Sequence, residues 1–344
     1  MKHPRKRAWQ RGLLTALCII LALILTAMVA LTMYANHLLN LIGRHDGDNI
    51  LTPEEASTLT YGDDEEETIP KGYTGPSLDG GDVTISTAES TIPQSKNAIN
   101  ILLVGQDRRP GEGRQRSDSM ILCTVDPDAK TITLTSFLRD MYVDIPGYWP
   151  TKMNHAYAYG GMTTLEVTLA VNFGIAVDGC MEVDFSGFES IVDLVGGVDI
   201  TMTAAEAQYF RDSYGFDAVV GVNHLDGKMA LNYARLRKIG SDFGRTQRQR
   251  NVLAAIFNSC NDLSVAQLNT LMNKALPLLT TNLTNAEILG YASKVFPLLS
   301  GCTLNTLRIP ADGTYEYGWV DEMSVLIVDL EANRQILRDA LTPD

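Results

Sequence analysis

The chain has 344 residues, of which 45% are hydrophobic, and its formal net charge is −13. A chain of this length and composition can bury at least one sizeable core, and the length alone allows two domains. The net acidity argues against a nucleic-acid partner.

The first 35 residues combine a basic stretch with an apolar run. Residues 1–12 carry five basic residues and no acid, and the 23 residues of 13–35 are uncharged and largely apolar. Such a run can cross a hydrocarbon core of about 30 Å as a helix, with its basic side in the cytoplasm. The alternative is a cleaved signal peptide, whose hydrophobic region is typically only about 7–15 residues long. We therefore predict a cytoplasmic tail over 1–12 and a transmembrane helix over 13–35, with the rest outside the cytoplasm.

Residues 36–96 separate this helix from the folded part of the chain. They are rich in Gly, Ser, Thr, Pro and acidic residues, and Asp46–Glu67 contains nine carboxylates and no Lys or Arg. The stretch has neither helical nor strand periodicity over any length. It is predicted to be an acidic flexible linker that holds a folded domain, 97–344, away from the bilayer.

Regular patterns begin at "NAINILLVGQD". Short apolar or alternating runs predict strands. The strands expected in the first half are 99–104, 119–126, 131–137 and 179–185. The sequence "DPDAK" is a good hairpin turn between the second and third of them. Helices are expected at 162–175 and 186–197, where Ser186 would open the second helix and Gly196 would close it.

Helical patterns dominate the second half. The helices expected there are 225–237, 245–260, 264–279, 285–299 and 330–341. Two strands, 303–310 and 323–329, interrupt them. Strands interleaved with helices predict an α/β fold, a three-layer α-β-α sandwich with helices on both faces of a central mixed sheet.

Four cysteines follow the apolar run. They are Cys123, Cys180, Cys260 and Cys302. Disulfides form in oxidising exteriors, but the spacing specifies neither a pairing nor a zinc site. We favour free buried thiols.

The stretch "YARLRKIGSDFGRTQRQR" concentrates five arginines and one lysine in eighteen residues, with Asp242 as its single acid. A cation-rich surface helix is one interpretation. The spacing favours a second, because several polar side chains fall at positions that can converge. These are Arg235, Arg237, Arg245 and Gln249. Guanidinium groups bind phosphate through paired donors, and a helix that starts near Gly244 would add its positive end. The stretch therefore predicts a clamp for a polyanionic substrate.

A second polar group surrounds the loop "VGQDRRPGEGRQRSDSM". Asp107 ends one predicted strand and Asp118 begins the next, so the two carboxylates meet at one sheet edge if these strands are neighbours. Carboxylate oxygens suit Mg²⁺, which takes one or two of them and fills its shell with water and phosphate. The alternative is that both acids are turn residues or partners of the loop arginines.

Further polar residues follow the third strand. Arg139 and Asp140 come directly after it, and "TKMNHAYAYGG", which we predict to be a loop, is unusually polar. Its polar side chains are Lys152, Asn154, His155 and Tyr157. A hydrogen-bonding role is favoured for His155 over a catalytic one.

Six segments, taken in order, strongly resemble the LytR-CpsA-Psr family of membrane-anchored phosphotransferases. They are "LLVGQDRR", "RSDSMIL", "RDMYVDIPG", "KMNHAYAYGG", "LDGKMALNYARLRK" and "SDFGRTQRQR". The resemblance runs from about Asn97 to the end, and the predicted anchor and linker match the family's layout. One departure is Leu138, which stands where members commonly have Pro, and it affects the local turn rather than the chemistry.

The resemblance implies an extracytoplasmic domain, in a Gram-positive-type bacterium, that binds a polyprenyl-pyrophosphate-linked glycan. The domain would transfer the phosphoglycan to a peptidoglycan hydroxyl and leave polyprenyl phosphate. Whether the polymer is teichoic acid, capsule or another wall glycan stays open. Mg²⁺ is the implied cofactor, with Mn²⁺ as an alternative, and Asp107 and Asp118 would hold it.

The resemblance also implies roles for particular residues. The catalytic residues would be Asp107, Asp118, Arg139 and Asp242, with Asp242 orienting the arginines or, as the weaker alternative, acting as a base. The substrate-binding residues would be Arg109, Arg116, Lys152, Arg235, Arg237, Arg245 and Gln249.

Three alternatives to this function stay open. A pyrophosphatase would act on the same lipid carrier with water in place of the wall hydroxyl. A regulatory protein could bind the lipid carrier without turnover. A nucleic-acid-binding role for the arginine-rich helix is disfavoured, because the predicted topology places that helix outside the cell.

Overall fold

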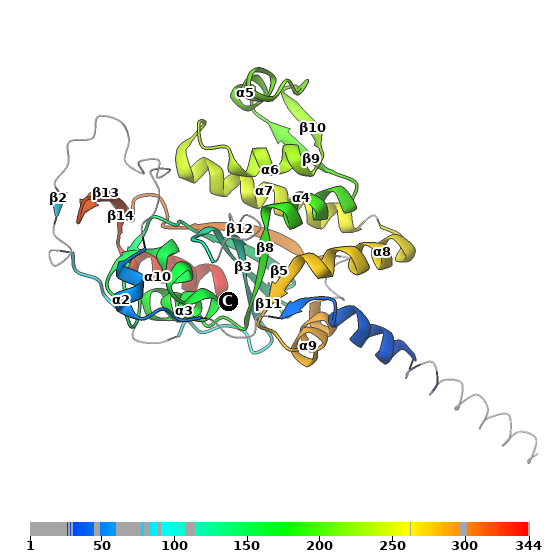
Figure 1. The fold of residues 1–344 in the computed structure, drawn as a ribbon, viewed down its shortest axis with the longest axis horizontal. Helices are drawn as coiled ribbons and strands as arrows, with labels where there is room; N and C mark the ends of the chain where they lie inside the picture. The colour runs from blue at the N-terminus through cyan, green and yellow to red at the C-terminus, as the bar shows by residue number, and fades with distance from the viewer. Residues whose placement is uncertain are drawn as a thin grey trace, which may run out of the picture.

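The computed structural model has a seven-stranded mixed sheet at its centre (Figure 1). The described residues are 26, 28, 30–44, 49–59, 77–78, 83–88, 91–106, 114–261, 263–295 and 301–342. In spatial order the strands are β1 (Gly43–Arg44), β11 (Leu279–Thr281), β8 (Gly179–Asp184), β3 (Ile99–Gln106), β4 (Ser117–Asp126), β5 (Thr131–Phe137) and β12 (Thr303–Ile309). The pairs β1/β11, β3/β8 and β5/β12 are parallel, and β11/β8, β3/β4 and β4/β5 are antiparallel.

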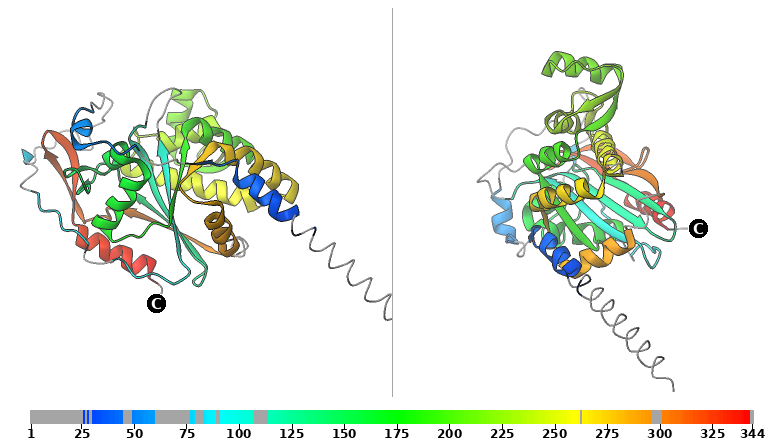
Figure 2. Two further views of the ribbon diagram at one scale, coloured as in Figure 1. Left: turned by 60° about the horizontal axis from the view of Figure 1, so that its bottom comes forward. Right: turned by 90° about the vertical axis from the view of Figure 1, so that its right-hand side faces the viewer.

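Helices cover both faces of the sheet, as the alternation of strands and helices predicts (Figure 2). Successive side chains of a strand point to opposite faces, so Ile121 and Leu122 of β4 enter different cores. Leu122 packs in the core that contains helices α3 (Met153–Phe173) and α10 (Leu330–Leu341). Ile121 packs in a core that contains α7 (Ser241–Asn261) and α9 (Asn285–Val295).

A further layer lies beyond α7 and has its own core (Figure 1). Its elements are α4 (Phe185–Leu194), β9 (Val198–Met202), α5 (Ala204–Tyr214), β10 (Gly221–Leu225), α6 (Gly227–Arg235) and α8 (Val265–Ala275). Val192, Phe210 and Tyr233 are buried in it. The antiparallel pair β9/β10 and the helix α5 between the two strands have no counterpart among the sequence predictions. Each of the two strands is only five residues long.

The remaining elements are short. A three-stranded sheet contains β2 (Ser77–Leu78), β13 (Tyr315–Val320) and β14 (Met323–Val328). A two-stranded pair contains β6 (Tyr142–Val143) and β7 (Thr151–Lys152). A helical turn, α2 (Pro53–Ser57), and a 3₁₀ turn, η2 (Leu276–Leu278), complete the set. The four cysteines at 123, 180, 260 and 302 are free thiols, as favoured above, but only Cys180 is buried and the other three are half-buried.

Most predicted elements are confirmed, but several need correction. The predicted helix 225–237 is shorter, because Leu225 ends β10 and α6 ends at Arg235. Residues 151–161 are not a loop but β7 and the start of α3, which kinks at Gly160 and Gly161. Asp184, not Ser186, caps α4 by accepting a hydrogen bond from the Gly187 backbone. Helix α7 begins at residue 241 rather than 245, and α8 ends at 275 because residues 279–281 join the sheet as β11.

The predicted linker also needs correction where it is described. Leu38, Leu39 and Ile42 are buried, and β1 extends the central sheet by pairing with β11. Asn40 accepts a hydrogen bond of 2.7 Å from Asn285 at the start of α9. Residues 38–44 therefore pack against the domain and are not part of a free linker. Within the described residues, no helix is both long and apolar enough to cross a membrane. Residues 1–25, which include the predicted tail and part of the predicted span, lie outside the described residues.

A buried ion pair fastens the additional layer to α7. Arg248 donates to Glu206 over 2.7 Å and to the Leu236 carbonyl over 2.6 Å, and both charged side chains are under one-tenth exposed. Removing one partner of a buried pair costs about 3–5 kcal/mol, because the other charge stays buried without compensation. We therefore expect Arg248→Ala to lower the free energy of unfolding by that amount in chemical denaturation. The matched control is Arg338→Ala on the surface of α10, where about 0.5 kcal/mol or less is expected, and equal losses in both variants would contradict this assignment.

Candidate active site

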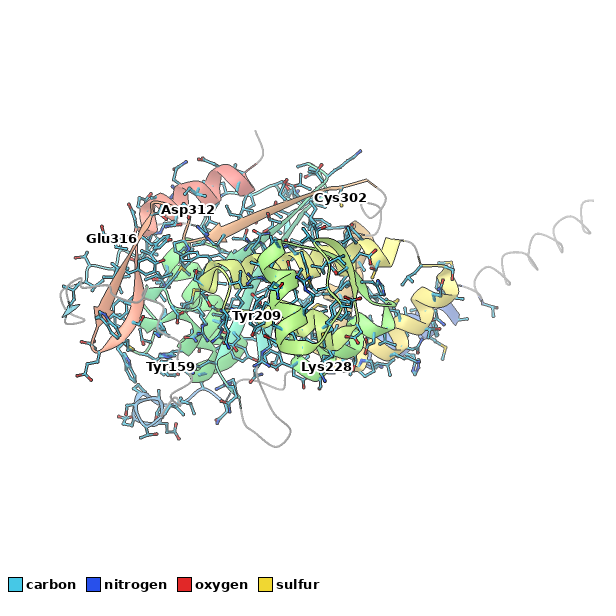
Figure 3. The ribbon with its side chains drawn as sticks, turned by 90° about the horizontal axis from the view of Figure 1, so that it is seen from above. Tyr159, Tyr209, Lys228, Cys302, Asp312 and Glu316 are labelled. Carbon is cyan, nitrogen blue, oxygen red and sulfur yellow. The ribbon has the colours of Figure 1, made fainter. Side chains whose placement is uncertain are left out.

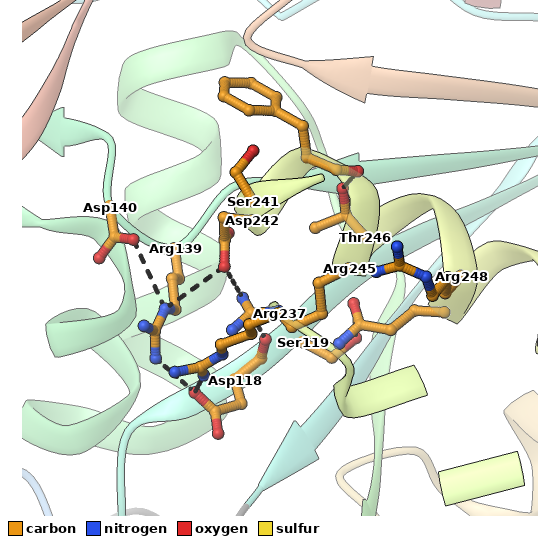
Figure 4. Close-up of polar contacts among 12 residues, drawn as sticks. Asp118, Ser119, Arg139, Asp140, Arg237, Ser241, Asp242, Arg245, Thr246 and Arg248 are labelled. Atoms are coloured by element: carbon orange, nitrogen blue, oxygen red, sulfur yellow. Dashed lines mark hydrogen bonds and ion pairs between the residues drawn. The ribbon is translucent and has the colours of Figure 1, made fainter. Parts of the chain in front are cut away.

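The site forms where β4 begins and β5 ends. Ile121 pairs with Ser136 in antiparallel register, so three residues further along each strand Asp118 comes to lie beside Arg139. The end of α6 and the start of α7 approach the same place and add Arg237 and Arg245 (Figure 4). The β4–β5 region and the α6–α7 region, which are distant in sequence, therefore meet at one end of the sheet.

Asp118 is the centre of this cluster. Its Oδ1 atom accepts a hydrogen bond of 2.8 Å from Arg139 Nη1 and lies 3.5 Å from Arg237 Nη2. Arg245 Nη2 donates to the Asp118 backbone carbonyl over 3.3 Å. The same Arg245 nitrogen lies 2.8 Å from Asp242 Oδ1, which is also 3.9 Å from Arg139 Nε. The Asp118 carboxylate therefore contacts Arg139 and Arg237, and the Asp242 carboxylate links Arg139 with Arg245.

Two further charged residues, Asp140 and Lys152, help to hold Arg139 in place. Asp140 lies 3.5 Å from Arg139 Nε and 3.4 Å from the amine of Lys152. Lys152, at the end of β7, is only 2% exposed, and Asp140 is 3% exposed. The backbone of Asn154 donates to the Arg139 carbonyl over 3.1 Å. Arg139 is thus fixed in position by contacts on several sides.

The pKa values show how tightly these charges are coupled. Burial acts to raise the pKa of Asp118, but Arg139, Arg245 and Arg237 outweigh it and hold that pKa below its ordinary value. For Arg139, burial acts to lower the pKa, and the three neighbouring carboxylates overcome it and raise the pKa. For Arg237, burial together with Arg245 and Arg139 lowers the pKa to about 10. The nearby Asp118 and Asp242 carboxylates therefore do not fully compensate the charge of Arg237.

The cluster also has unused hydrogen-bond donors and surplus positive charge. Among the described residues, the ion pairs above join four cations, three of them arginines, with three carboxylates. Arg245 is 2% exposed, and its Nε and Nη1 atoms have no hydrogen-bond partner in that part of the chain. Buried donors are normally satisfied, and guanidinium groups suit phosphate oxygens. The arrangement is fit to bind a multivalent oxyanion.

The other predicted site residues lie in several places. Gln249 accepts a hydrogen bond of 3.2 Å from Ser119, next to Asp118. Arg235 lies with its guanidinium 4.3 Å from the centre of the Phe185 ring, so it faces a different neighbour from Arg237. Arg116 is half-buried just before β4.

Two predicted residues, Asp107 and Arg109, lie outside the described residues. The strands that flank their loop are neighbours, as the expected edge site requires. Gln106, which precedes Asp107 in the chain, pairs with Ser117.

His155 of α3 and two buried carboxylates, Asp140 and Glu182, have further contacts. His155 Nδ1 lies 3.0 Å from Thr151 Oγ1, which fits the hydrogen-bonding role favoured above. Sequence reasoning named Asp140 without giving it a role, and it missed Glu182 altogether. Glu182 on β8 accepts hydrogen bonds from Gln106 over 2.7 Å and from Tyr157. The only sequence signal for Glu182 was an acid inside a strand that is otherwise largely apolar.

The Asp118 carboxylate is the predicted magnesium ligand that lies among the described residues. Asp118 Oδ1 binds both guanidinium groups, while no hydrogen bond or ion pair joins Oδ2 to another described residue. Within the described ranges there is no group of three or more His, Cys, Asp or Glu residues suited to a metal. Because Mg²⁺ commonly takes only one or two protein carboxylates, this sparse set fits such an ion.

A mixed sheet covered by helices, with a cationic cluster at one end of its strands, defines an α/β protein whose cluster is suited to an anion. The chain belongs to the LytR-CpsA-Psr family, whose model matches residues 66–340. It is 36% identical over 230 residues to the polyisoprenyl-teichoic acid–peptidoglycan teichoic acid transferase TagU of Oceanobacillus iheyensis, covering 59% of this chain and 70% of TagU. It is 38% identical over 176 residues to the corresponding transferase TagT of Bacillus subtilis, covering 49% of this chain and 55% of TagT.

A solved structure of a family member gives the fold comparison. The family protein YwtF (TagT) with bound octaprenyl pyrophosphate lipid matches with a TM-score of 0.55 and 27% identity. The match covers 78% of this chain and 99% of that one.

Proposed function

We propose that this protein transfers a phosphoglycan from a polyprenyl-pyrophosphate carrier to a hydroxyl group of peptidoglycan. The observation that carries the proposal is the convergence of Arg139, Arg237 and Arg245 on Asp118, with surplus positive charge and unused donors. Two relatives named as teichoic acid transferases and a family structure with a bound prenyl pyrophosphate support the same substrate class.

The reaction is a displacement at phosphorus. The acceptor oxygen forms a bond to the phosphorus that carries the glycan, and the bond from that phosphorus to the bridging oxygen breaks. Polyprenyl phosphate leaves with the electron pair, and the acceptor hydroxyl gives up its proton. Phosphoryl transfer depends mainly on positioning and on neutralising charge. Arg245 would bind the phosphate oxygens, because its Nε and Nη1 atoms have no partner among the described residues. Arg237 would join it, because burial and two neighbouring guanidinium groups lower its pKa.

The remaining charged residues would keep this arrangement in place before substrate binds. Asp242 connects Arg245 with Arg139, and Asp140 connects Arg139 with Lys152. Preorganised donors act without reorganisation during the reaction, which is the source of their catalytic effect. We therefore assign Asp242 to orienting the arginines.

Magnesium is part of the proposal. Asp107 and Asp118 would hold it, and Asp118 Oδ2 is the oxygen of that carboxylate that no described residue engages. When bound, the ion would neutralise charge on the phosphate oxygens.

The proposed setting is the outer face of the membrane of a Gram-positive-type bacterium. Residues 13–35 would anchor the chain as a transmembrane helix with residues 1–12 in the cytoplasm. The packing of residues 38–44 against the sheet and α9 would then keep the domain close to the bilayer, where a lipid carrier lies. Its partners would be the carrier-linked glycan, peptidoglycan and the membrane.

The proposal is tested by incubating the purified full-length chain with a polyprenyl-pyrophosphoryl saccharide, peptidoglycan oligomers and Mg²⁺. We expect mass spectrometry to find a phosphodiester-linked conjugate that disappears when EDTA is added. Free phosphoglycan without conjugate would instead indicate a pyrophosphatase. Unchanged donor in the presence of bound lipid would indicate a carrier-binding protein without turnover.

A further inference from the structure

A second group of cationic and polar side chains lies at the sheet face that α7 covers. Ser136 of β5 pairs directly with Arg308 of β12. Both residues fall on the strand face that carries Leu134 and Leu304, and those two leucines belong to the core beneath α7. Arg250 of α7 is the third member of this group, because it lies on the same helix face as Leu253 and Phe257, which belong to that core. The charge of Arg308 also affects the pKa of Arg250.

Two of the three side chains are buried with unused polar atoms. Arg250 is 4% exposed, and its Nε and Nη1 atoms have no hydrogen-bond partner in the described part of the chain. Its Nη2 atom donates to Gln247 over 2.6 Å. Ser136 is 1% exposed, and its hydroxyl also lacks a partner there. Because buried donors are normally satisfied, these atoms indicate a ligand.

The charges at this site are not balanced by buried acids. No ion pair joins Arg250 to an acid among the described residues, and burial followed by the charge of Arg308 lowers the pKa of Arg250 to about 10. Arg308 has one acidic partner, Asp312, at 2.6 Å, but that carboxylate is 90% exposed on the outside of the molecule (Figure 3). Arg308 also donates to the Pro310 carbonyl over 3.0 Å. A buried cation without compensation is costly, so an anion bound here would stabilise the fold.

One wall of the site leads toward the Asp118 cluster. The guanidinium of Arg308 lies 4.4 Å from the centre of the Phe243 ring, and Phe243 stacks on Tyr315 at 5.1 Å. Phe243 directly follows Asp242, which belongs to the cluster. A single extended substrate could therefore reach both places along the first turns of α7.

We propose that Arg250, Arg308 and Ser136 form a second oxyanion site, separate from the Asp118 cluster, that binds a phosphate group. Arg250 Nε, Arg250 Nη1 and the Ser136 hydroxyl are donors without a partner among the described residues, and Arg308 adds a second positive charge. That arrangement suits the several oxygens of a tetrahedral phosphate better than the two coplanar oxygens of a carboxylate. The site does not depend on the proposed transfer reaction, since it needs only a bound phosphate.

Phosphate binding to the purified full-length chain tests this proposal. Inorganic phosphate is titrated calorimetrically into the wild type, Arg250→Gln and Arg245→Gln. We expect two binding events in the wild type. Arg250→Gln should weaken one event about tenfold or more, because charged hydrogen bonds are lost, and Arg245→Gln should weaken only the other.

Two controls make the outcome decisive. Ser136→Ala and Arg308→Gln should weaken the same event as Arg250→Gln, and they decide the matter if that variant fails to fold. Acetate should compete poorly at this event. Both phosphate events surviving unchanged in folded Arg250→Gln, or acetate competing as well as phosphate, would overturn the proposal.

Discussion

Replacing Arg237 with alanine is expected to reduce the rate of conjugate formation by about 100-fold or more. This magnitude is typical for the loss of one preorganised donor to a developing oxyanion. Burial and two neighbouring guanidinium groups lower the pKa of Arg237 to about 10. Its side chain is 22% exposed, so substrate can reach it. Asp118 Oδ1 lies 3.5 Å from Arg237 Nη2, and a bound phosphate would add charge compensation at Arg237.

The rate is measured as initial conjugate formation from a polyprenyl-pyrophosphoryl saccharide. The matched control is Arg338→Ala, which removes an arginine of α10 that pairs with the exposed Glu331. We expect that variant to change the rate by less than about twofold, because it lies in none of the site contacts. A rate for Arg237→Ala within the range of this control would contradict the assigned role.

Asp118→Asn is expected to abolish transfer and to lower the free energy of unfolding by about 3 kcal/mol. The carboxylate offsets the charges of Arg139, Arg245 and Arg237, and amide replacement leaves these cations facing one another. Chemical denaturation of both proteins measures the loss. Asp312→Asn is the control, because its carboxylate is 90% exposed and should contribute little.

The stability difference between wild type and Asp118→Asn should depend on pH. The folded-state pKa of Asp118 lies below its ordinary value, so its stabilisation is fully present above the unfolded-state pKa of about 3.9. It is lost as the pH falls through the folded value. The two denaturation curves should therefore converge below about pH 4 and stay apart at neutral pH. A constant difference across that range would show that the effect is steric rather than ionic.

Local sequence patterns were sufficient for much of the fold. The strand over 131–137 and the helix over 330–341 have the predicted bounds, because each has a clear period and clear end signals. Residues 151–161 were misjudged for a physical reason. Their polar side chains suggested a loop, yet Lys152 and His155 are buried because partners from elsewhere in the fold satisfy them.

The candidate site shows the same limit. The sequence named Arg139, Arg237 and Arg245 and the acid Asp118, and the fold brings all four together. It did not separate Arg237 from Arg235. That distinction depends on where α6 ends, because residue 235 is its last helical residue and residue 236 has extended backbone angles. Sequence periodicity alone does not locate the end of a helix to within two residues.

A comparison of lipid affinities tests most directly whether the cluster around Asp118 is built for a diphosphate. The full-length chain in detergent is titrated with polyprenyl pyrophosphate and with polyprenyl monophosphate of the same chain length. We expect the pyrophosphate to bind at least about tenfold more tightly, since it reaches additional charged donors, and we expect Arg245→Gln to remove most of that preference. Equal affinity for the two lipids in the wild-type protein would contradict the claim.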